Sequence, residues 1–334
     1  MSPTRRLLDP DQVRRYVAAS LGPTVRVTGC GPLTGGGFAA VWWVGLDDGR
    51  TVVLKVGPPP QVPLLRYERG LVAAEARYLR LVAARAPAVP VPPLLHHGSD
   101  ADLGDWLLVG HLPGRTLADL AADGVPVEPV RQQLGAALAA LHRVTGDRFG
   151  YDGGRAGGPT WRAAFTAMLD ELLADAADWA VPLPVPASRL RELVDRHAAV
   201  LDAVRRPALL HFDGWAGNVL ADVGEDGAYR LTGLVDGERH LWGDPVMDLV
   251  SPLLGRRAED EPGDAFLRGY RAAAHGVGPD DDGVRRRSGL YRLHLYLLMT
   301  VEMPSRGITA GSDPGRVRRL AGRLDRELAD LGRP

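Results

Sequence analysis

Two carboxylates and one amide occur at a spacing that suits phosphoryl transfer. His211 is followed by Asp213 and, five residues after that, by Asn218. In such a loop Asp213 can accept a hydroxyl proton while Asn218 faces a metal ion. Asp236 comes directly after the apolar run 231–235, so we expect it at the end of a strand, where a carboxylate can hold Mg²⁺. A His-x-Asp pair, an Asn and a later Asp, in this order, form the arrangement that kinases use.

A glycine-rich turn lies upstream of this segment, between two predicted strands. Its residues Gly35, Gly36 and Gly37 would let backbone N–H groups approach phosphates closely. The turn is not a Walker A loop, because Gly37 and Phe38 occupy the places of the Lys and the Ser or Thr. It is not a dinucleotide fingerprint either, since no predicted helix follows directly. An ordinary flexible hairpin is the alternative interpretation.

The predicted strand 51–56 contains Lys55. Alternation puts Lys55 and Val53 on one face, which we expect the glycine-rich turn to cover. We therefore expect Lys55 to contact nucleotide phosphates and to pair with a helix carboxylate. Glu75 is the predicted partner, because it lies in the middle of a helix beside apolar positions, and Glu68 is the second candidate. The alternatives are a lysine that reaches solvent and ordinary surface charges on the helix.

Several polar residues near the loop have less specific interpretations. His211 is predicted to brace the loop by hydrogen bonds, since an Asp can act as the base. Glu238 could touch a second metal ion or pair with Arg239. Asp244 and Asp248 are predicted to cap and anchor the helix that follows.

The elements that must position these residues fall into two groups. The first third of the chain is rich in predicted strands, and the remainder is rich in predicted helices, with a small β insert at 209–235. We find no internal repeat and no long linker. Strands are predicted at 25–30, 39–46, 51–56, 94–97 and 106–109, and helices at 9–20, 64–85, 129–143, 161–179, 188–204, 244–254, 264–274, 283–302 and 313–331.

Length and composition indicate an ordinary globular protein with two domains or lobes. The chain has 334 residues, of which 45% are hydrophobic and 24% charged. Its formal net charge of -1 gives no sign of nucleic acid or an anionic membrane as a partner. The single cysteine, Cys30, excludes an intramolecular disulfide and a cysteine-based zinc site. We see neither a membrane-spanning apolar stretch nor a signal peptide, so we expect a cytoplasmic enzyme.

Taken together, these residues resemble the aminoglycoside phosphotransferase superfamily, which also contains choline kinase-like and fructosamine kinase-like small-molecule kinases. The resemblance runs from Gly35 through Lys55, Glu75 and the Asp213 loop to 234–249. It implies an α+β fold of the bilobal, protein-kinase-like type. The expected N-terminal lobe, with an antiparallel sheet, covers 1–110, and the mainly helical C-terminal lobe covers 111–334, with the nucleotide between them.

The resemblance also implies roles. Lys55 matches the phosphate lysine, Glu75 its partner, Asp213 the catalytic base, and Asn218 and Asp236 the Mg²⁺ ligands. The glycines of the turn would contact ATP or GTP phosphates, and the connection from Val109 to Leu112 would contact the base through its backbone. Two departures indicate a distinct subfamily: Phe212 and Gly214 replace the usual Gly and Leu, and Gly237 is the middle residue of the Asp-Gly-Glu triplet.

We therefore expect Mg²⁺-dependent transfer of the γ-phosphate of ATP or GTP to a hydroxyl of a small polar metabolite. An antibiotic of the aminoglycoside or nucleoside type is the first candidate, and a sugar or amino sugar is the second. Glu302 or Asp170 could receive a cationic acceptor, and the helices 161–179 and 283–302 could form its wall.

A non-catalytic, nucleotide-binding pseudokinase is the alternative from a different class. The presence of Lys55, Asp213, Asn218 and Asp236 together argues against it. A protein kinase is less favoured still, because no Ala-Pro-Glu segment follows Asp236.

Overall fold

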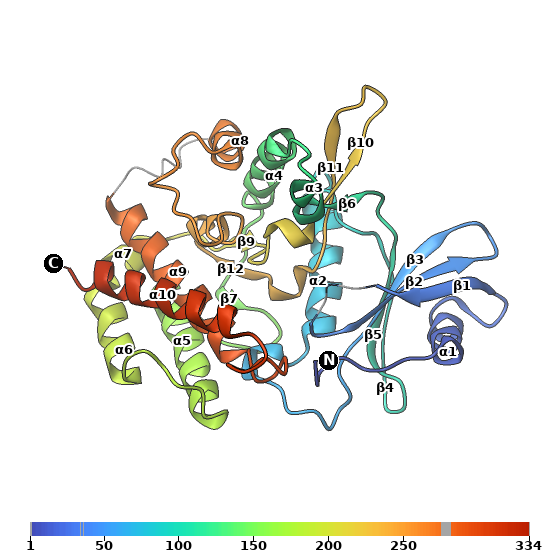
Figure 1. Cartoon of the computed structure of the whole chain (residues 1–334), viewed down its shortest axis with the longest axis horizontal. Helices are drawn as coiled ribbons and strands as arrows, with labels where there is room; N and C mark the ends of the chain where they lie inside the picture. Colours follow the sequence, from blue (N-terminus) through green and yellow to red (C-terminus); the bar gives the residue numbers. More distant parts are fainter. Residues whose placement is uncertain (1, 34, 36, 275–281, 334) are drawn as a thin grey trace.

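The computed structural model describes residues 2–33, 35, 37–274 and 282–333. Its N-terminal part contains an antiparallel sheet and its C-terminal part is mainly helical, with helix α2 (Leu71–Arg85) between them (Figure 1). This is the α+β arrangement that the sequence predicts. Gly36 of the predicted site lies outside the described residues.

The N-terminal sheet has five strands in the order β1-β2-β3-β5-β4, and all neighbouring strands are antiparallel. Helix α1 (Pro10–Leu21) packs on one face of this sheet. Its first turn is fixed by Asp9, whose side chain accepts a hydrogen bond from the backbone of Gln12. The strands are β1 (Val27–Pro32), β2 (Ala40–Leu46), β3 (Thr51–Val56), β4 (Leu94–Asp100) and β5 (Gly104–Gly110).

The two faces of β3 have different neighbours. Val52, Leu54 and Val56 are buried in one cluster with the apolar side of α1. Lys55 therefore lies on the opposite face, where its cross-strand partner on β5 is Leu107. Strand alternation thus directs the lysine away from α1 and toward α2.

Helix α2 packs against both parts of the molecule. Its Tyr78, Leu79 and Val82 share a buried cluster with Leu107 of the sheet and Leu138 of the helical part. A helix in this position can carry side chains to the sheet and to the loops of the helical part at once.

The predicted helix 64–85 is wrong at its start. A 3₁₀ turn (Arg66–Glu68) comes first, and α2 begins only at Leu71. Gly70 separates the two with a φ of +70°, a left-handed conformation that glycine adopts readily and that interrupts a helix.

Helices α5 (Trp161–Asp178) and α9 (Asp282–Val301) meet in the core of the helical part, where Phe165 and Tyr291 have ring centroids 5.5 Å apart. Two other predicted helices differ from the structure: 188–204 is divided at His197, and 244–254 is a 3₁₀ helix followed by turns. The remaining helical elements are α3 (Leu117–Ala122), α4 (Glu128–Leu141), α6 (Ala187–Arg196), α7 (Ala198–Asp202), the 3₁₀ helix Pro245–Leu249, α8 (Ala265–Ala273) and α10 (Pro314–Leu331).

Short strands of the helical part hold the candidate loops. Strand β10 (Val219–Val223) begins directly after Asn218 and pairs with β11 (Tyr229–Leu234), which ends just before Asp236. This hairpin brings Asn218 and Asp236 to the same end of the sheet, and the Val235 N–H donates to the Asn218 carbonyl at 3.0 Å. The other strands are β6 (Arg115–Thr116), β7 (Phe149–Tyr151), β8 (Gly157–Gly158), β9 (Ala208–Leu210) and β12 (Leu241–Gly243).

Throughout the part of the chain that the structure describes, no helix combines the length and the apolar character that a bilayer span requires.

Candidate active site

Asp213 is presented by an unusual turn. The residue before it, Phe212, has a φ of +62° and a completely buried ring. Such a conformation costs about 1–3 kcal/mol in a residue other than glycine and persists only when the surroundings hold it. The surroundings here are the carboxylate of Asp248, which accepts hydrogen bonds from the backbone N–H groups of His211 at 2.8 Å and Phe212 at 2.7 Å.

Asp248 is therefore an anchor of the Asp213 loop, and the prediction that it serves the following helix is wrong. His142 Nε2 lies 3.0 Å from the same carboxylate. Burial raises the pKa of Asp248, but the contact with His142 outweighs burial and holds the pKa below its ordinary value. Asp244, by contrast, does cap the next 3₁₀ helix, since it accepts a hydrogen bond from the Val246 N–H at 3.1 Å.

Asn218 is bound to the same loop. Its side-chain amide donates to the Asp213 carbonyl at 3.0 Å, and its side chain is buried. His211 completes the brace, because its Nδ1 accepts a hydrogen bond from the Asp213 N–H at 3.3 Å. The predicted role of His211, to brace the loop by a hydrogen bond, is thus confirmed. The two hydrogen bonds fix the positions of Asp213 and Asn218 relative to each other.

Lys55 forms the link between sheet and loops. Its ammonium donates to Glu75 Oε1 at 2.6 Å and also to Asp236. Burial by itself lowers the pKa of Lys55, but the two carboxylates outweigh it and raise the pKa above its ordinary value, so the lysine stays charged. Glu68, the second candidate partner, lies elsewhere: it accepts hydrogen bonds from the Leu65 N–H and from Ser305.

Tyr78 explains the glycine in Asp-Gly-Glu, and sequence reasoning missed it. A Cβ atom on Gly237 would lie 2.1 Å from the Tyr78 ring, so no larger residue fits there. The same ring contacts His211 and His240, with centroids 5.5 and 5.4 Å apart. Because Tyr78 follows Glu75 by about one helical turn, one face of α2 supports both the Asp213 loop and the Asp236 loop.

Three carboxylates gather beside Lys55. Oxygens of Glu75, Asp236 and Glu238 lie within 4.8 Å of one another. Burial, together with Asp236 and Glu75, raises the pKa of Glu238 to about 8. Carboxylate oxygens are the ligands that Mg²⁺ prefers, and one lysine cannot neutralise three of them. The residues present therefore fit a divalent cation, and Glu238 joins Asn218 and Asp236 as a candidate ligand.

Arg239 is a second residue that sequence reasoning did not assign to the site. Its Nε lies 3.8 Å from Asp213 Oδ2, and its Nη2 donates to Glu302 at 2.8 Å. Burial raises the pKa of Asp213 and the Arg239 guanidinium opposes that effect, with a net rise. A carboxylate with a raised pKa takes up a proton more readily than an ordinary aspartate does.

The two carboxylates suggested for a cationic acceptor are engaged otherwise. Glu302 is buried and accepts hydrogen bonds from Arg239 and from Tyr67. Asp170 lies on the surface and pairs with Arg191 at 2.5 Å. This part of the sequence interpretation is not supported by their surroundings.

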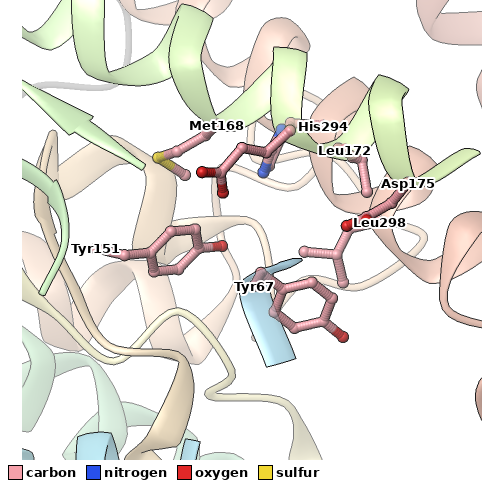
Figure 2. Close-up of a pocket in the computed structure, with 8 residues that line it drawn as sticks. Tyr67, Tyr151, Met168, Leu172, Asp175, His294 and Leu298 are labelled. Atoms are coloured by element: carbon pink, nitrogen blue, oxygen red, sulfur yellow. The ribbon is translucent and has the colours of Figure 1, made fainter. Parts of the chain in front are cut away.

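A small pocket lies between α5, α9, Tyr67 and Tyr151 (Figure 2). Within the described residues, the Tyr151 hydroxyl and both ring nitrogens of His294 are buried without a hydrogen-bond partner. The His294 ring lies 6.2 Å from that of Phe212, the residue before Asp213. Burial lowers the pKa of His294 to about 4, so its imidazole is neutral at pH 7.

One wall of this pocket carries Glu171, whose pKa is raised by burial and by Asp175. The lining from α5 and α9 falls in the helices 161–179 and 283–302 that the sequence proposed as the acceptor wall.

The remaining predicted residues belong to the N-terminal sheet and to the segment that joins β1 to β2. Gly35 has a φ of +112°, which favours glycine, and the Gly37 carbonyl accepts a hydrogen bond from Thr4 at 2.9 Å. Val109 lies inside the sheet, opposite Val53 and Leu94. The contacts of these residues with a nucleotide stay predictions.

Comparison with solved structures establishes the fold. A putative fructosamine-3-kinase from Thermobifida fusca YX-ER1 has a TM-score of 0.68 and 22% identity, over 96% of this chain and 100% of its own. A thermostable mutant of the aminoglycoside phosphotransferase APH(4)-Ia, solved with AMP-PNP and hygromycin B, has a TM-score of 0.63 and 18% identity, over 96% and 99%.

A GDP complex of a mutant aminoglycoside 2'-phosphotransferase-IIIa follows, with a TM-score of 0.61 and 16% identity, over 96% of this chain and 98% of that one. No protein with curated annotation matches the sequence significantly. The model of the phosphotransferase enzyme family, APH, matches residues 30–290, which is most of the chain, and the protein belongs to this family.

Proposed function

We propose that this phosphotransferase requires Mg²⁺ and moves the γ-phosphate of ATP or GTP to a hydroxyl of a small polar molecule. One observation carries the proposal: the Lys55 ammonium binds Glu75 of α2 and Asp236 of the helical part at the same time. The contact with Asp236 joins the N-terminal sheet to the loop that follows β11. Residues that are far apart in the sequence thus form one site with the groups that phosphoryl transfer needs.

In this proposal Asp213 orients the acceptor hydroxyl and removes its proton as the oxygen attacks the γ-phosphorus. Lys55 holds the phosphates, and Glu75 keeps the lysine in place. Asn218, Asp236 and Glu238 would hold Mg²⁺, which neutralises charge on the phosphates when it is bound.

The ligands of the structural neighbours support the same classes of ligand here. The neighbours were solved with AMP-PNP, with GDP and with hygromycin B. We infer that this chain also takes a nucleoside triphosphate and a small molecule with a hydroxyl, without nucleic acid or membrane as a partner. A cytoplasmic location and lobes at 1–110 and 111–334 belong to the proposal.

We propose that the acceptor lies beside Asp213 and reaches the pocket with Tyr151, His294 and Glu171. The neutral imidazole and the hydroxyl offer unused hydrogen-bonding capacity, and the carboxylate favours a cationic amine. An antibiotic of the aminoglycoside or nucleoside type, with a role in resistance, is one candidate. A sugar or amino sugar is the other candidate, because its hydroxyls can form hydrogen bonds with the Tyr151 hydroxyl and the His294 imidazole.

The experiment is mass spectrometry of candidate acceptors after incubation with the protein, Mg²⁺ and ATP or GTP. The panel contains aminoglycosides, nucleoside antibiotics, sugars and amino sugars, and Asp213→Asn serves as the blank. We expect one compound to gain a single phosphoryl group, and the gain to be absent with Asp213→Asn. Nucleotide binding without a product from any compound would favour the alternative, a regulatory pseudokinase.

A further inference from the structure

A buried arginine after α9 reaches the N-terminal part of the molecule. Arg306 Nη2 pairs with Glu68 Oε1 at 2.9 Å, and the Arg306 side chain is only 9% exposed. The guanidinium carbon lies 5.0 Å from the centroid of the Phe38 ring, a cation–π geometry. Phe38 is buried and directly follows Gly37 of the glycine-rich turn. A residue of the C-terminal part thus packs on the segment that we propose carries the nucleotide phosphates.

The start of the chain strengthens this contact. Thr4 is fully buried, donates its hydroxyl hydrogen to the Gly37 carbonyl at 2.9 Å, and lies 3.5 Å from Arg306 Nη1. Arg5 donates to the Leu33 carbonyl at 2.9 Å. The described backbone on both sides of the turn is therefore held by side chains from distant segments.

In the other direction, the contacts lead to Asp213. Arg306 Nη2 lies 3.8 Å from Glu302 Oε2, and the same oxygen accepts a hydrogen bond from Arg239 at 2.8 Å. Arg239 Nε in turn lies 3.8 Å from Asp213 Oδ2. Phe38 and Asp213 are thus joined by three side chains that are nearly all buried, where charges are screened little by water or salt.

We propose that Arg306 is a positioning residue which, through Glu302 and Arg239, couples nucleotide binding at the glycine-rich turn to the alignment of Asp213. This inference rests on the proposed function. The Phe38 ring keeps the Arg306 guanidinium beside the turn. Phosphates near Gly37 and Phe38 therefore bring negative charge beside Arg306 and change how strongly it is drawn to Glu302. A weaker or stronger attraction between Arg306 and Glu302 changes the hydrogen bond between Glu302 and Arg239. Arg239 lies next to Asp213, so the position of the Asp213 carboxylate changes with it.

Two substitutions at the Phe38 end break the chain of contacts and leave Asp213, Arg239 and Glu302 unchanged. Phe38→Leu removes the π face but keeps an apolar side chain, and Arg306→Gln removes the charge. The matched control is Arg323→Gln, because the Arg323 guanidinium lies over the Tyr296 ring at 5.5 Å, at a position outside the path.

The test is amide hydrogen exchange of residues 211–218, with and without Mg²⁺ and AMP-PNP, in the full-length protein. We expect the nucleotide to slow exchange of this loop in the unmodified protein and in Arg323→Gln. In Phe38→Leu and Arg306→Gln the slowing should shrink by about fivefold, the equivalent of one cation–π contact of about 1 kcal/mol. Nucleotide affinity is measured for every variant by calorimetry, and folding by thermal melting.

The outcomes separate the two proposals. If all variants bind the nucleotide and protect the loop equally, the coupling through Arg306 is wrong and the proposed function stands. If the unmodified protein binds no nucleotide, the proposed function fails, and the coupling fails with it. If Arg306→Gln does not fold, Phe38→Leu decides the question by itself, since it leaves every buried charge paired.

Discussion

The two buried charge clusters of this molecule differ in their balance. In one cluster Lys55 pairs with Glu75 and Asp236, and the Glu238 carboxylate lies beside theirs. The excess of negative charge is reflected in Glu238, whose pKa is raised to about 8 by burial and by its carboxylate neighbours.

In the other cluster both glutamates have arginine partners, and the three arginines outnumber them. Arg239, Arg306 and Arg316 surround Glu302, and Arg306 also pairs with Glu68. Here the Arg239 and Arg306 guanidinium groups outweigh burial and hold the pKa of Glu302 below its ordinary value. Because a buried charge without a partner is costly, the cluster with an excess of carboxylates indicates a place for a cationic ligand, whereas the paired glutamates of the arginine cluster indicate a positioning role.

The largest effect is expected at Asp213, which lies between the two clusters. Asp213→Asn removes the proposed base without a change in size, so turnover should fall on the order of 10²–10⁴-fold while nucleotide affinity is kept. Steady-state kinetics on the acceptor found by mass spectrometry, with calorimetry of nucleotide binding, measures both quantities. Unchanged turnover would rule out the assignment.

Lys55→Met tests the unbalanced cluster directly. The substitution leaves three neighbouring carboxylates without their cation, and a broken buried pair costs about 3–5 kcal/mol of folding free energy. Part of this loss should return with Mg²⁺, which supplies positive charge to the same oxygens. Urea denaturation with and without Mg²⁺ measures the free energy of unfolding. The control is Arg191→Met, which breaks an exposed ion pair with Asp170. Equal stability of the two variants would contradict the proposed role of Lys55 in stabilising the buried carboxylates.

Gly237→Ala tests the packing that holds the cluster in place. The new Cβ would lie 2.1 Å from the Tyr78 ring, so Tyr78 or the loop must move. We expect a loss of about 1–3 kcal/mol and a clear drop in turnover. The control is Gly322→Ala, because nothing lies within 4 Å of a Cβ at that helix position. Thermal melts and kinetics of both variants decide, and equal behaviour would show that Tyr78 does not constrain the loop.

The pH dependence of stability sharpens the same comparison. The pKa of Glu238 is about 8 in the folded protein and about 4.5 unfolded, so protonated Glu238 favours the folded state. Its contribution is fully present below about pH 4.5 and is lost as the pH rises through about 8, provided no metal is bound. Mg²⁺ favours the ionised carboxylate, so the rise in Tm that it causes should be a few degrees larger at about pH 8.5 than at about pH 6.

Glu238→Gln should remove this difference, because its amide does not titrate in the range. A difference that persists in Glu238→Gln would assign the titration to another group.

Local patterns in the sequence predicted most residues of the candidate site. The spacing from Asp213 to Asn218, the strand position of Lys55 and the helix position of Glu75 are features of short segments, and alternation and helical periodicity reveal them. The same periodicity did not reveal that α2 starts after Gly70, since a single left-handed residue changes the backbone without changing the apolar pattern.

The sequence by itself determined the α+β class, the order of the elements, the phosphotransferase family and which polar groups were candidates. Only the tertiary structure decided how those groups are held: Asp248 beneath the Phe212 turn, Tyr78 against Gly237, and the path from Arg306 through Glu302 to Arg239. These contacts join segments far apart in the chain. Their geometry depends on how helices and strands pack, and no local spacing of residue types specifies that packing.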